Sequence, residues 1–285
     1  MPKIPKIIHY CFGFSPNFGY KPWSLVHYVC VRSALERLKP DAAHFYYEYE
    51  PSGPWWELTK PLLALQKIEA PREIFGRPVE HPAHRADVVR LQKLIEHGGI
   101  YLDCDVLVQR SFDDLLDNSF VISQEGVDGA LGLSNAVLLS EPATPFVKRW
   151  YEEYRSFRGS EFWVEHSVQL PLKLSKHTQW DIKILPHWAF CWPLHYEEHL
   201  KWIFEPGQPP ISEPVYANHL WETLAWTRYL EHLTPGRVRQ TDGHFHEWAR
   251  PFLAEIPDDF GAPSIADRIR VNVRGRMRNL KNRFF

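Results

Sequence analysis

The sequence predicts an α/β fold in which helices flank a mostly parallel central sheet. The first reason is that strand-like and helix-like segments alternate along the first hundred residues, as strand 6–12, helix 24–38, strand 44–49, helix 59–68 and helix 84–97. The second is an apolar run at 100–108, typical of a buried strand, which carries two aspartates. Alternation of this kind indicates parallel strands, because each crossover between them needs a connecting helix.

Local signals set the limits of these elements. A stretch rich in glycine, proline, asparagine and serine at 13–22 predicts a loop after the first strand. Ser24 is suited to cap the next helix, which should end near Leu38, before a proline. Residues 51–56 predict a turn, and Pro61 favours a helix start within 59–68. Two further strands and a helix are expected at 120–123, 135–139 and 144–157.

The two aspartates of the apolar run carry the strongest functional signal. Asp103 and Asp105 are two residues apart, so a strand places both carboxylates on one face and Cys104 on the other. Carboxylates are costly in an apolar setting, and two adjacent negative charges must protonate or find a cation. A hard divalent ion, Mg²⁺ or Mn²⁺, meets this demand and also binds diphosphates. The pattern therefore indicates a sugar-nucleotide site, although such carboxylates can also cap a following turn.

The surrounding sequence resembles the DxD glycosyltransferases of family 32. The matching segments are Ile4-Pro-Lys-Ile-Ile-His9-Tyr10, Asp87-Val-Val-Arg90, Gly98-Gly99-Ile-Tyr-Leu-Asp103-Cys-Asp105, and Asn218-His219-Leu-Trp221 followed by Trp226. The resemblance implies a GT-A type fold, a nucleoside-diphosphate sugar donor with a UDP or GDP leaving group, and retention of anomeric configuration. One difference is that the family often carries a tryptophan shortly after the opening histidine, where this chain has Cys11-Phe12-Gly13-Phe14.

The resemblance also implies roles for single residues. It assigns Asp105 and His219 to the metal and Asp103 to the donor ribose and sugar, which makes both aspartates catalytic. Asp87 and Arg90 are expected to reach donor hydroxyls, with an ordinary ion pair on the helix as the alternative. The remaining donor-binding candidates are His9, Tyr101, Asn135 and Trp221. For these four the alternative is a structural role, as a buried ring or a turn cap.

Composition limits the class of protein. The chain has 285 residues, 44% of them hydrophobic, and a formal net charge of −2, which fits a globular protein and gives no reason to expect a nucleic-acid partner. Four cysteines lie far apart without metal-binding spacing, so we expect reduced, buried thiols. No apolar run of signal-peptide or membrane-spanning length is evident. We therefore expect a cytoplasmic protein.

A basic tail follows the predicted catalytic domain, which we place at 1–266. Residues 267–285 contain seven Lys or Arg and one acid, so this segment carries +6 and the remainder −8 within the net −2. Its apolar residues recur along one helical stripe at Ile269, Val273, Met277, Leu280 and Phe284. The pattern predicts a helix that rests on an anionic membrane at its inner face or packs back on the acidic body.

The sequence thus predicts a metal-dependent glycosyltransferase that moves a hexosyl unit to a glycan or lipid-linked acceptor hydroxyl, in surface polysaccharide or glycolipid synthesis. A nucleotidyltransferase would need a glycine-rich, basic loop near the N-terminus, and residues 7–19 contain no cluster of lysine or arginine. A non-catalytic sugar-nucleotide or carbohydrate-binding protein on the same fold is the alternative. Loss of either aspartate would favour that alternative, and both are present.

Overall fold

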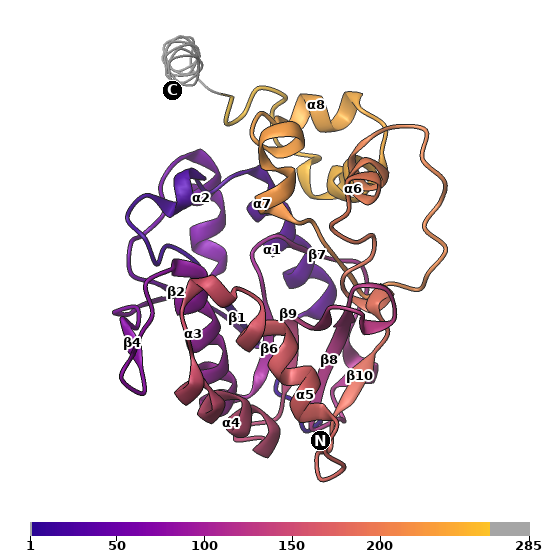
Figure 1. Ribbon diagram of the computed structural model, residues 1–285. Coiled ribbons are helices and arrows are strands. Elements are labelled where there is room, and N and C mark those ends of the chain that lie inside the picture. The colour runs from indigo at the N-terminus through magenta and orange to yellow at the C-terminus, as the bar shows by residue number, and fades with distance from the viewer. Residues whose placement is uncertain (1, 263–285) are drawn as a thin grey trace, which may run out of the picture.

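The computed structural model describes residues 2–262 and is built on a seven-stranded sheet (Figure 1). In spatial order the strands are β10 (Lys183–Leu185), β8 (Phe120–Glu125), β9 (Gly132–Ser140), β6 (Gly99–Leu102), β1 (Ile7–Cys11), β2 (Ala42–Tyr47) and β3 (Ala64–Lys67). Every neighbouring pair is parallel except those of β9, which runs antiparallel to β6 and β8. The predicted α/β fold with a mostly parallel sheet is confirmed.

Helices cover both faces of the sheet. On one face α1 (Leu25–Leu38) and α2 (Pro54–Thr59) pack in one hydrophobic core, and on the other α3 (Pro82–His97) and α4 (Pro145–Glu152) pack in a second. Side chains alternate between the two cores along β6, because Ile100 and Leu102 join the first and Tyr101 the second. Tyr101 therefore faces the core that also contains α3.

The C-terminal part adds short elements around this sheet. They are α5 (Leu170–Ser175), α6 (Glu197–Phe204), β11 (Ala217–His219), α7 (Glu222–Ala225), α8 (Pro235–Gln240) and α9 (His244–Ala249). Figure 1 shows α6, α7 and α8 gathered at the end of the sheet opposite α4. Two small antiparallel sheets pair β11 with β7 (Val106–Val108) and β4 (Glu73–Ile74) with β5 (Arg77–Pro78). No helix within residues 2–262 has the length and apolarity needed to cross a membrane.

Two expected elements differ from the sequence prediction. The predicted helix 59–68 is wrong, because its second half is β3, whose Leu65 pairs with Phe45 of β2, and the helix lies earlier, at α2. Strand pairing here outweighs local helix preference. The predicted strand 100–108 is broken at 103–105 by a turn in which the Val106 amide donates to the Asp103 carbonyl at 3.1 Å. Both aspartates therefore lie on a turn between β6 and β7.

Other expectations are confirmed or lie outside the described residues. Ser24 is the N-cap of α1, which ends at Leu38, and the four cysteines are buried and free. The predicted helix after Thr144 begins at Pro145 as α4 and continues as a 3₁₀ turn to Ser156. The domain boundary at 266 and the basic tail 267–285 lie beyond residue 262, where the described residues end.

Gly98 and Gly99 connect α3 to β6. The backbone conformation at both positions requires glycine. Their φ angles are +65° and +102°, which side chains of L-residues rarely adopt. Gly98 also caps α3, since its amide donates to the Leu94 carbonyl at 2.9 Å. A Cβ on Gly99 would overlap the backbone carbonyl oxygen of Ile7 on β1. The glycine pair thus lets β6 enter the sheet directly against β1.

We predict that Gly99→Ala lowers the free energy of unfolding by about 1–3 kcal/mol more than Gly53→Ala, because of the overlap with β1. Gly53 is a matched control, since its φ is also +102° and a Cβ there would have no neighbour within 4 Å. Urea denaturation of the two variants measures the difference. Equal losses of stability would show that backbone strain alone, and not the contact with Ile7, requires glycine at position 99.

Candidate active site

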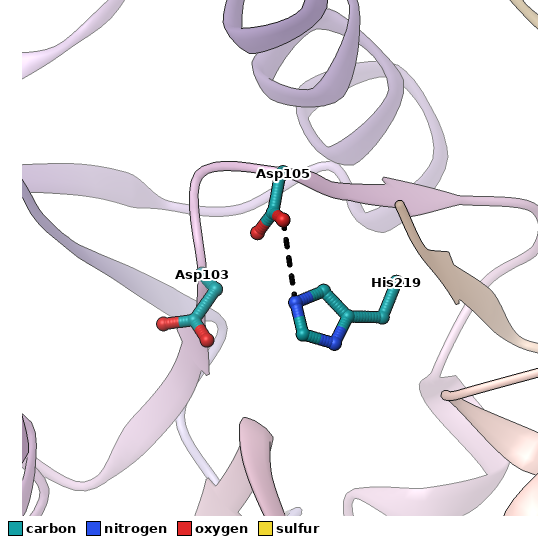
Figure 2. A group of neighbouring side chains, drawn as sticks. All are labelled: Asp103, Asp105 and His219. Atoms are coloured by element: carbon teal, nitrogen blue, oxygen red, sulfur yellow. Dashed lines mark ion pairs between the residues drawn. The ribbon is translucent and has the colours of Figure 1, made fainter. Parts of the chain in front are cut away.

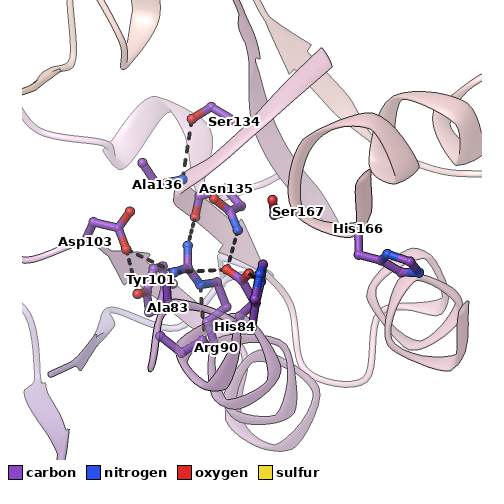
Figure 3. A network of polar contacts seen from close by, with 12 residues as sticks. Ala83, His84, Arg90, Tyr101, Asp103, Ser134, Asn135, Ala136, His166 and Ser167 are labelled. Atoms are coloured by element: carbon purple, nitrogen blue, oxygen red, sulfur yellow. Dashed lines mark hydrogen bonds and ion pairs between the residues drawn. The ribbon is translucent and has the colours of Figure 1, made fainter. Parts of the chain in front are cut away.

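The buried guanidinium of Arg90 joins three separate chain segments. Its Nη2 lies 3.3 Å from Oδ1 of Asp87 on α3 and 3.2 Å from Oδ1 of Asp103 after β6. Its Nη1 donates to the carbonyl of Asn135 on β9 at 2.6 Å (Figure 3). The guanidinium also lies over the Tyr101 ring, 4.3 Å from its centroid. Burial alone would lower the pKa of Arg90, but Asp103, Tyr101 and Asp87 raise it above its usual range, so the charge is fixed.

Asp87 is held on both oxygens by neighbours other than Arg90. The side-chain amide of Asn135 donates to its Oδ1 at 2.8 Å. The Nδ1 atom of His84, one turn earlier on α3, lies 3.3 Å from its Oδ2. Asp87 is 6% exposed and His84 3%, so this cluster is deep in the protein. Buried charges are tolerated when paired and hydrogen-bonded, as they are here.

The second aspartate faces a histidine from the C-terminal part of the chain (Figure 2). The antiparallel pairing of β7 and β11 puts His219 opposite Val106, next to Asp105. The His219 Nε2 atom lies 3.3 Å from Oδ2 of Asp105. The same oxygen accepts from the backbone amide of Glu222 at 2.8 Å. Single oxygen or nitrogen atoms of Asp103, Asp105 and His219 all lie within 4.8 Å of one another.

The two aspartates ionise differently because their neighbours differ. Burial raises the pKa of Asp103, and the charge of Asp105 adds to the increase despite the opposing effect of Arg90. Burial would also raise the pKa of Asp105, but the charge and contact of His219 and the Glu222 amide lower it well below its usual range. Burial opposes the charge on His219, yet Asp105 raises the pKa of His219 to about 9. Without a metal, His219 is thus the cation beside Asp105.

These groups surround a polar cavity of about 270 Å³, near the lower end of the range for small-molecule sites. Its lining residues are Ala83, His84, Asp87, Arg90, Asp103, Asp105, Asn135, Trp163, Ser167, His219, Glu222 and Thr223. A second, more apolar cavity of about 190 Å³ shares Ala83 with the first. It is lined by Cys11, Phe12, Gly13, Phe14, Ser15, Phe18, Gly19, His81, Pro82, Ala83 and Ala86.

The structure brings most of the predicted site residues into the polar cavity. Those that line it are Asp87, Arg90, Asp103, Asp105, Asn135 and His219. Tyr101 lies beneath it, and its hydroxyl donates to Oδ1 of Asp103 at 2.7 Å. Trp221 packs on His219 with ring centroids 4.1 Å apart, and its indole donates to the Pro193 carbonyl. Both can position site residues, but neither lines the cavity.

His9 lies apart from this group. Its ring is 0% exposed, with Nε2 2.8 Å from the Gly98 carbonyl and Nδ1 3.1 Å from the Tyr46 hydroxyl. Burial lowers the pKa of His9 to about 4, so the ring is neutral near pH 7. The structure therefore gives His9 packing contacts at the start of β6 in place of the donor contact that the sequence suggested.

Glu222 is a cavity residue that the sequence did not indicate. His27 of α1 accepts a hydrogen bond at Nδ1 from the Ser24 amide, 3.0 Å away, so its proton is on Nε2. That Nε2 lies 3.1 Å from Oε1 of Glu222. Lys21 approaches the other carboxylate oxygen at 3.5 Å. The first turn of α1 thereby fixes the segment whose amide holds Asp105.

Five other lining residues were also missed, namely Ala83, His84, Trp163, Ser167 and Thr223. His84 shares a helix face with Asp87 at a spacing of three residues, which could have indicated it. Trp163 follows a 3₁₀ turn at Ser160–Phe162, and Ser167 lies on the π-helical turn Glu165–Gln169 that comes next, so both belong to an irregular stretch. Such a stretch has no hydrophobic period by which its orientation could be predicted.

We predict that Arg90→Ala lowers the free energy of unfolding by about 3–5 kcal/mol, because it leaves buried carboxylates without their cation. Asp103→Asn should cost less, since the pKa of Asp103 is raised and its charge is already disfavoured. Lys93→Ala is a control on the same helix, where an exposed pair with Glu96 contributes under about 1 kcal/mol. Chemical denaturation compares the three variants. Equal losses for Arg90→Ala and Lys93→Ala would contradict the role given to Arg90.

Comparisons with known proteins identify the family of this chain. A family model described as a glycosyltransferase sugar-binding region containing a DXD motif matches residues 31–122, a range that includes Asp87, Arg90, Asp103 and Asp105. A similar protein is glucan organizing enzyme 1 of Cryptococcus neoformans var. grubii, 37% identical over 267 residues that make up 90% of this chain and 72% of the relative. Mannosyl phosphorylinositol ceramide synthase of Saccharomyces cerevisiae is 29% identical over 55% of this chain and 40% of its own length.

Two solved glycosyltransferase structures show limited similarity to this chain. The galactosyltransferase LgtC aligns with a TM-score of 0.44 and 14% identity over 89% of this chain and 98% of its own. The bifunctional glycosyltransferase WbbM aligns with a TM-score of 0.48 and 11% identity over 90% of this chain and 50% of its own. On the sequence relationship to the Cryptococcus protein and the matched region, this chain belongs to the glycosyltransferases whose sugar-binding region contains a DXD motif.

Proposed function

We propose that this glycosyltransferase moves a hexosyl unit from a nucleoside-diphosphate sugar to an acceptor hydroxyl and depends on Mn²⁺ or Mg²⁺. The observation that carries the proposal is the cluster of Asp103, Asp105 and His219 at the edge of a polar cavity. Three candidate ligand atoms within 4.8 Å of one another suit one small cation with positions left for phosphate oxygens.

The donor set fits such a cation. Carboxylate oxygens are the ligands that Mg²⁺ and Mn²⁺ prefer, and a neutral imidazole is acceptable to Mn²⁺. Asp105 and His219 would hold the ion, with Asp103 turned toward the donor by Arg90 and Tyr101. A bound divalent ion would neutralise the charge that develops on the diphosphate leaving group.

The two adjoining cavities suit the two ends of a sugar nucleotide. The polar cavity offers Asp87, Arg90 and Asn135 to sugar hydroxyls. The apolar cavity at the end of β1 offers the rings of Phe12 and Phe18, which stack on each other with centroids 5.8 Å apart. We assign the nucleoside to the apolar cavity and the hexosyl group to the polar one. Phenylalanine here would take the position for which related enzymes use tryptophan.

Retention of configuration is best explained by attack on the same face as the leaving group. Each carboxylate that lines the polar cavity is already engaged, Asp87 and Asp103 by Arg90, Asp105 by His219 and Glu222 by His27. We therefore assign no enzymatic nucleophile. The bond from the anomeric carbon to the phosphate oxygen breaks, the bond to the acceptor oxygen forms, and the acceptor proton passes to the departing phosphate.

The names of two relatives support a role in polysaccharide or glycolipid synthesis. One relative is named for glucan organisation and the other for synthesis of a mannosylated inositol phosphorylceramide. Both names concern hexoses, in a glucan or on a glycolipid. We therefore propose a hexosyl donor for this chain and a glycan or lipid-linked acceptor.

We predict that release of nucleoside diphosphate from the sugar donor requires Mn²⁺ or Mg²⁺ and stops in excess EDTA. Asp105→Asn should lower the rate on the order of 10²-fold or more, because leaving-group stabilisation is lost. Its folding should persist, as judged by circular dichroism. Asp117→Asn serves as a control, because Asp117 is exposed and outside the cavity. Full activity in EDTA would refute the metal assignment.

The basic segment 267–285 supports a further proposal, namely that the enzyme acts at the inner face of a membrane. Each basic residue near an anionic surface contributes on the order of 1 kcal/mol, less at high salt. We predict that the full chain sediments with anionic vesicles at low salt and that a chain ending at Ala266 does so much less. Equal sedimentation of both would exclude this segment as the membrane contact.

A further inference from the structure

One wall of the polar cavity is not used by the proposed donor arrangement. It consists of Trp163, Ser167 and the far edge of His84. In the view of Figure 3, Ser167 lies on the other side of Asn135 from Asp103, the first aspartate. A transferase needs a second ligand in the same cavity, and this wall is available for it.

Trp163 is an aromatic surface that is both exposed and held in place. Its side chain is 48% exposed although it lines the cavity. Two imidazoles pack against it, the exposed His81 and the buried His84, with ring centroids at 4.6 Å and 4.8 Å and interplanar angles of 81° and 56°. A fixed indole loses little conformational entropy when a ligand stacks on it. Its neighbours Phe162 and Val164 are also exposed, at 36% and 40%.

His84 supplies a buried hydrogen-bond acceptor beside this indole. Its Nδ1 faces the Asp87 carboxylate at 3.3 Å, so Nδ1 is the donor in this contact, and an imidazole with its one proton on Nδ1 accepts at Nε2. Its Nε2 therefore has a free lone pair. That atom is buried and has no hydrogen-bond partner among residues 2–262. An unpaired buried polar atom is unfavourable, and a ligand hydroxyl would satisfy it.

Ser167 completes the wall with a hydroxyl that can rotate. Its Oγ makes a long contact of 3.4 Å with the carbonyl of Trp163. The residue lies on the π-helical turn Glu165–Gln169, and such turns are frequent at functional sites. The wall thus combines one aromatic face, one buried acceptor and one adaptable hydroxyl.

We infer that this wall is the acceptor subsite and binds a six-membered ring that carries several hydroxyls. The C–H face of the ring stacks on Trp163, and one hydroxyl donates to Nε2 of His84. This inference rests on the proposed function, because that function assigns other residues of the cavity to the donor. The ring can be a pyranose at the end of a glycan or the inositol of a lipid headgroup, since both present the same chemistry.

The test measures ring binding separately from turnover. The full chain is mixed with Mg²⁺ and with UDP or GDP. Ligand-observed NMR then records whether it binds the methyl α-pyranosides of glucose, mannose and galactose, or myo-inositol. We expect Trp163→Ala to raise the dissociation constant about tenfold through loss of stacking, and Trp163→Phe to restore most of it. Trp248→Ala is the control, because Trp248 is only half-buried, stacks on His244 and lies outside the cavity.

The outcomes separate this inference from the proposed function. Binding by the wild type that is weakened by Trp163→Ala and unchanged by Trp248→Ala supports the subsite, and the ring that binds identifies its source. Failure of every ring compound to bind the wild type overturns the inference. An equal weakening of nucleotide binding by Trp163→Ala also overturns it, because the residue would then belong to the donor site. Absence of nucleoside-diphosphate release from every sugar donor, measured in parallel, refutes the proposed function instead.

Discussion

The site depends on the ion pairs that the buried Arg90 makes with Asp87 and Asp103. Without Arg90 the carboxylates of Asp87 and Asp103 would lie close together in a buried setting with no cation between them. The planar guanidinium contacts both carboxylates and the Asn135 carbonyl at once, so it fixes α3, the turn after β6 and β9 relative to one another. A single buried cation therefore holds together the part of the cavity that is formed by Asp87, Asp103 and Asn135.

The side of the site that we propose to hold the metal is built from different contacts. Asp105 is held by the Glu222 amide, and β7 pairs with β11 to bring His219 against it. Glu222 is in turn positioned by His27 at the start of α1. The two aspartates of one short turn thus enter different electrostatic environments, which raise the pKa of Asp103 and lower that of Asp105. When the environments of two neighbouring carboxylates push their pKa values apart, the two groups can take separate roles in one site.

The sequence indicated the local parts of this arrangement and not the contacts made over long range. The aspartate pair, the helix that carries Asp87 and Arg90, and the glycine pair are local patterns, and the structure has each of them. The strand β3 was missed because parallel pairing with β2, and not local preference, decides its conformation.

The missed cavity residues have a similar explanation. The approach of Glu222 to Asp105 depends on β-pairing between distant segments, which a single sequence does not specify. Trp163 and Ser167 come from an irregular stretch without a hydrophobic period. For His9 the difference is in the other direction. The family resemblance suggested a donor contact, and the structure buries the ring against Gly98 and Tyr46.

We propose that a cation binds where the two halves of the site meet. The most direct test is an X-ray structure of crystals grown with Mn²⁺ and a nucleoside diphosphate, with data collected near the manganese absorption edge. We expect an anomalous peak between Asp105 and His219, in contact with diphosphate oxygens and next to Asp103. A nucleotide bound in the cavity with no anomalous peak at these residues, or a peak elsewhere on the protein, would contradict it.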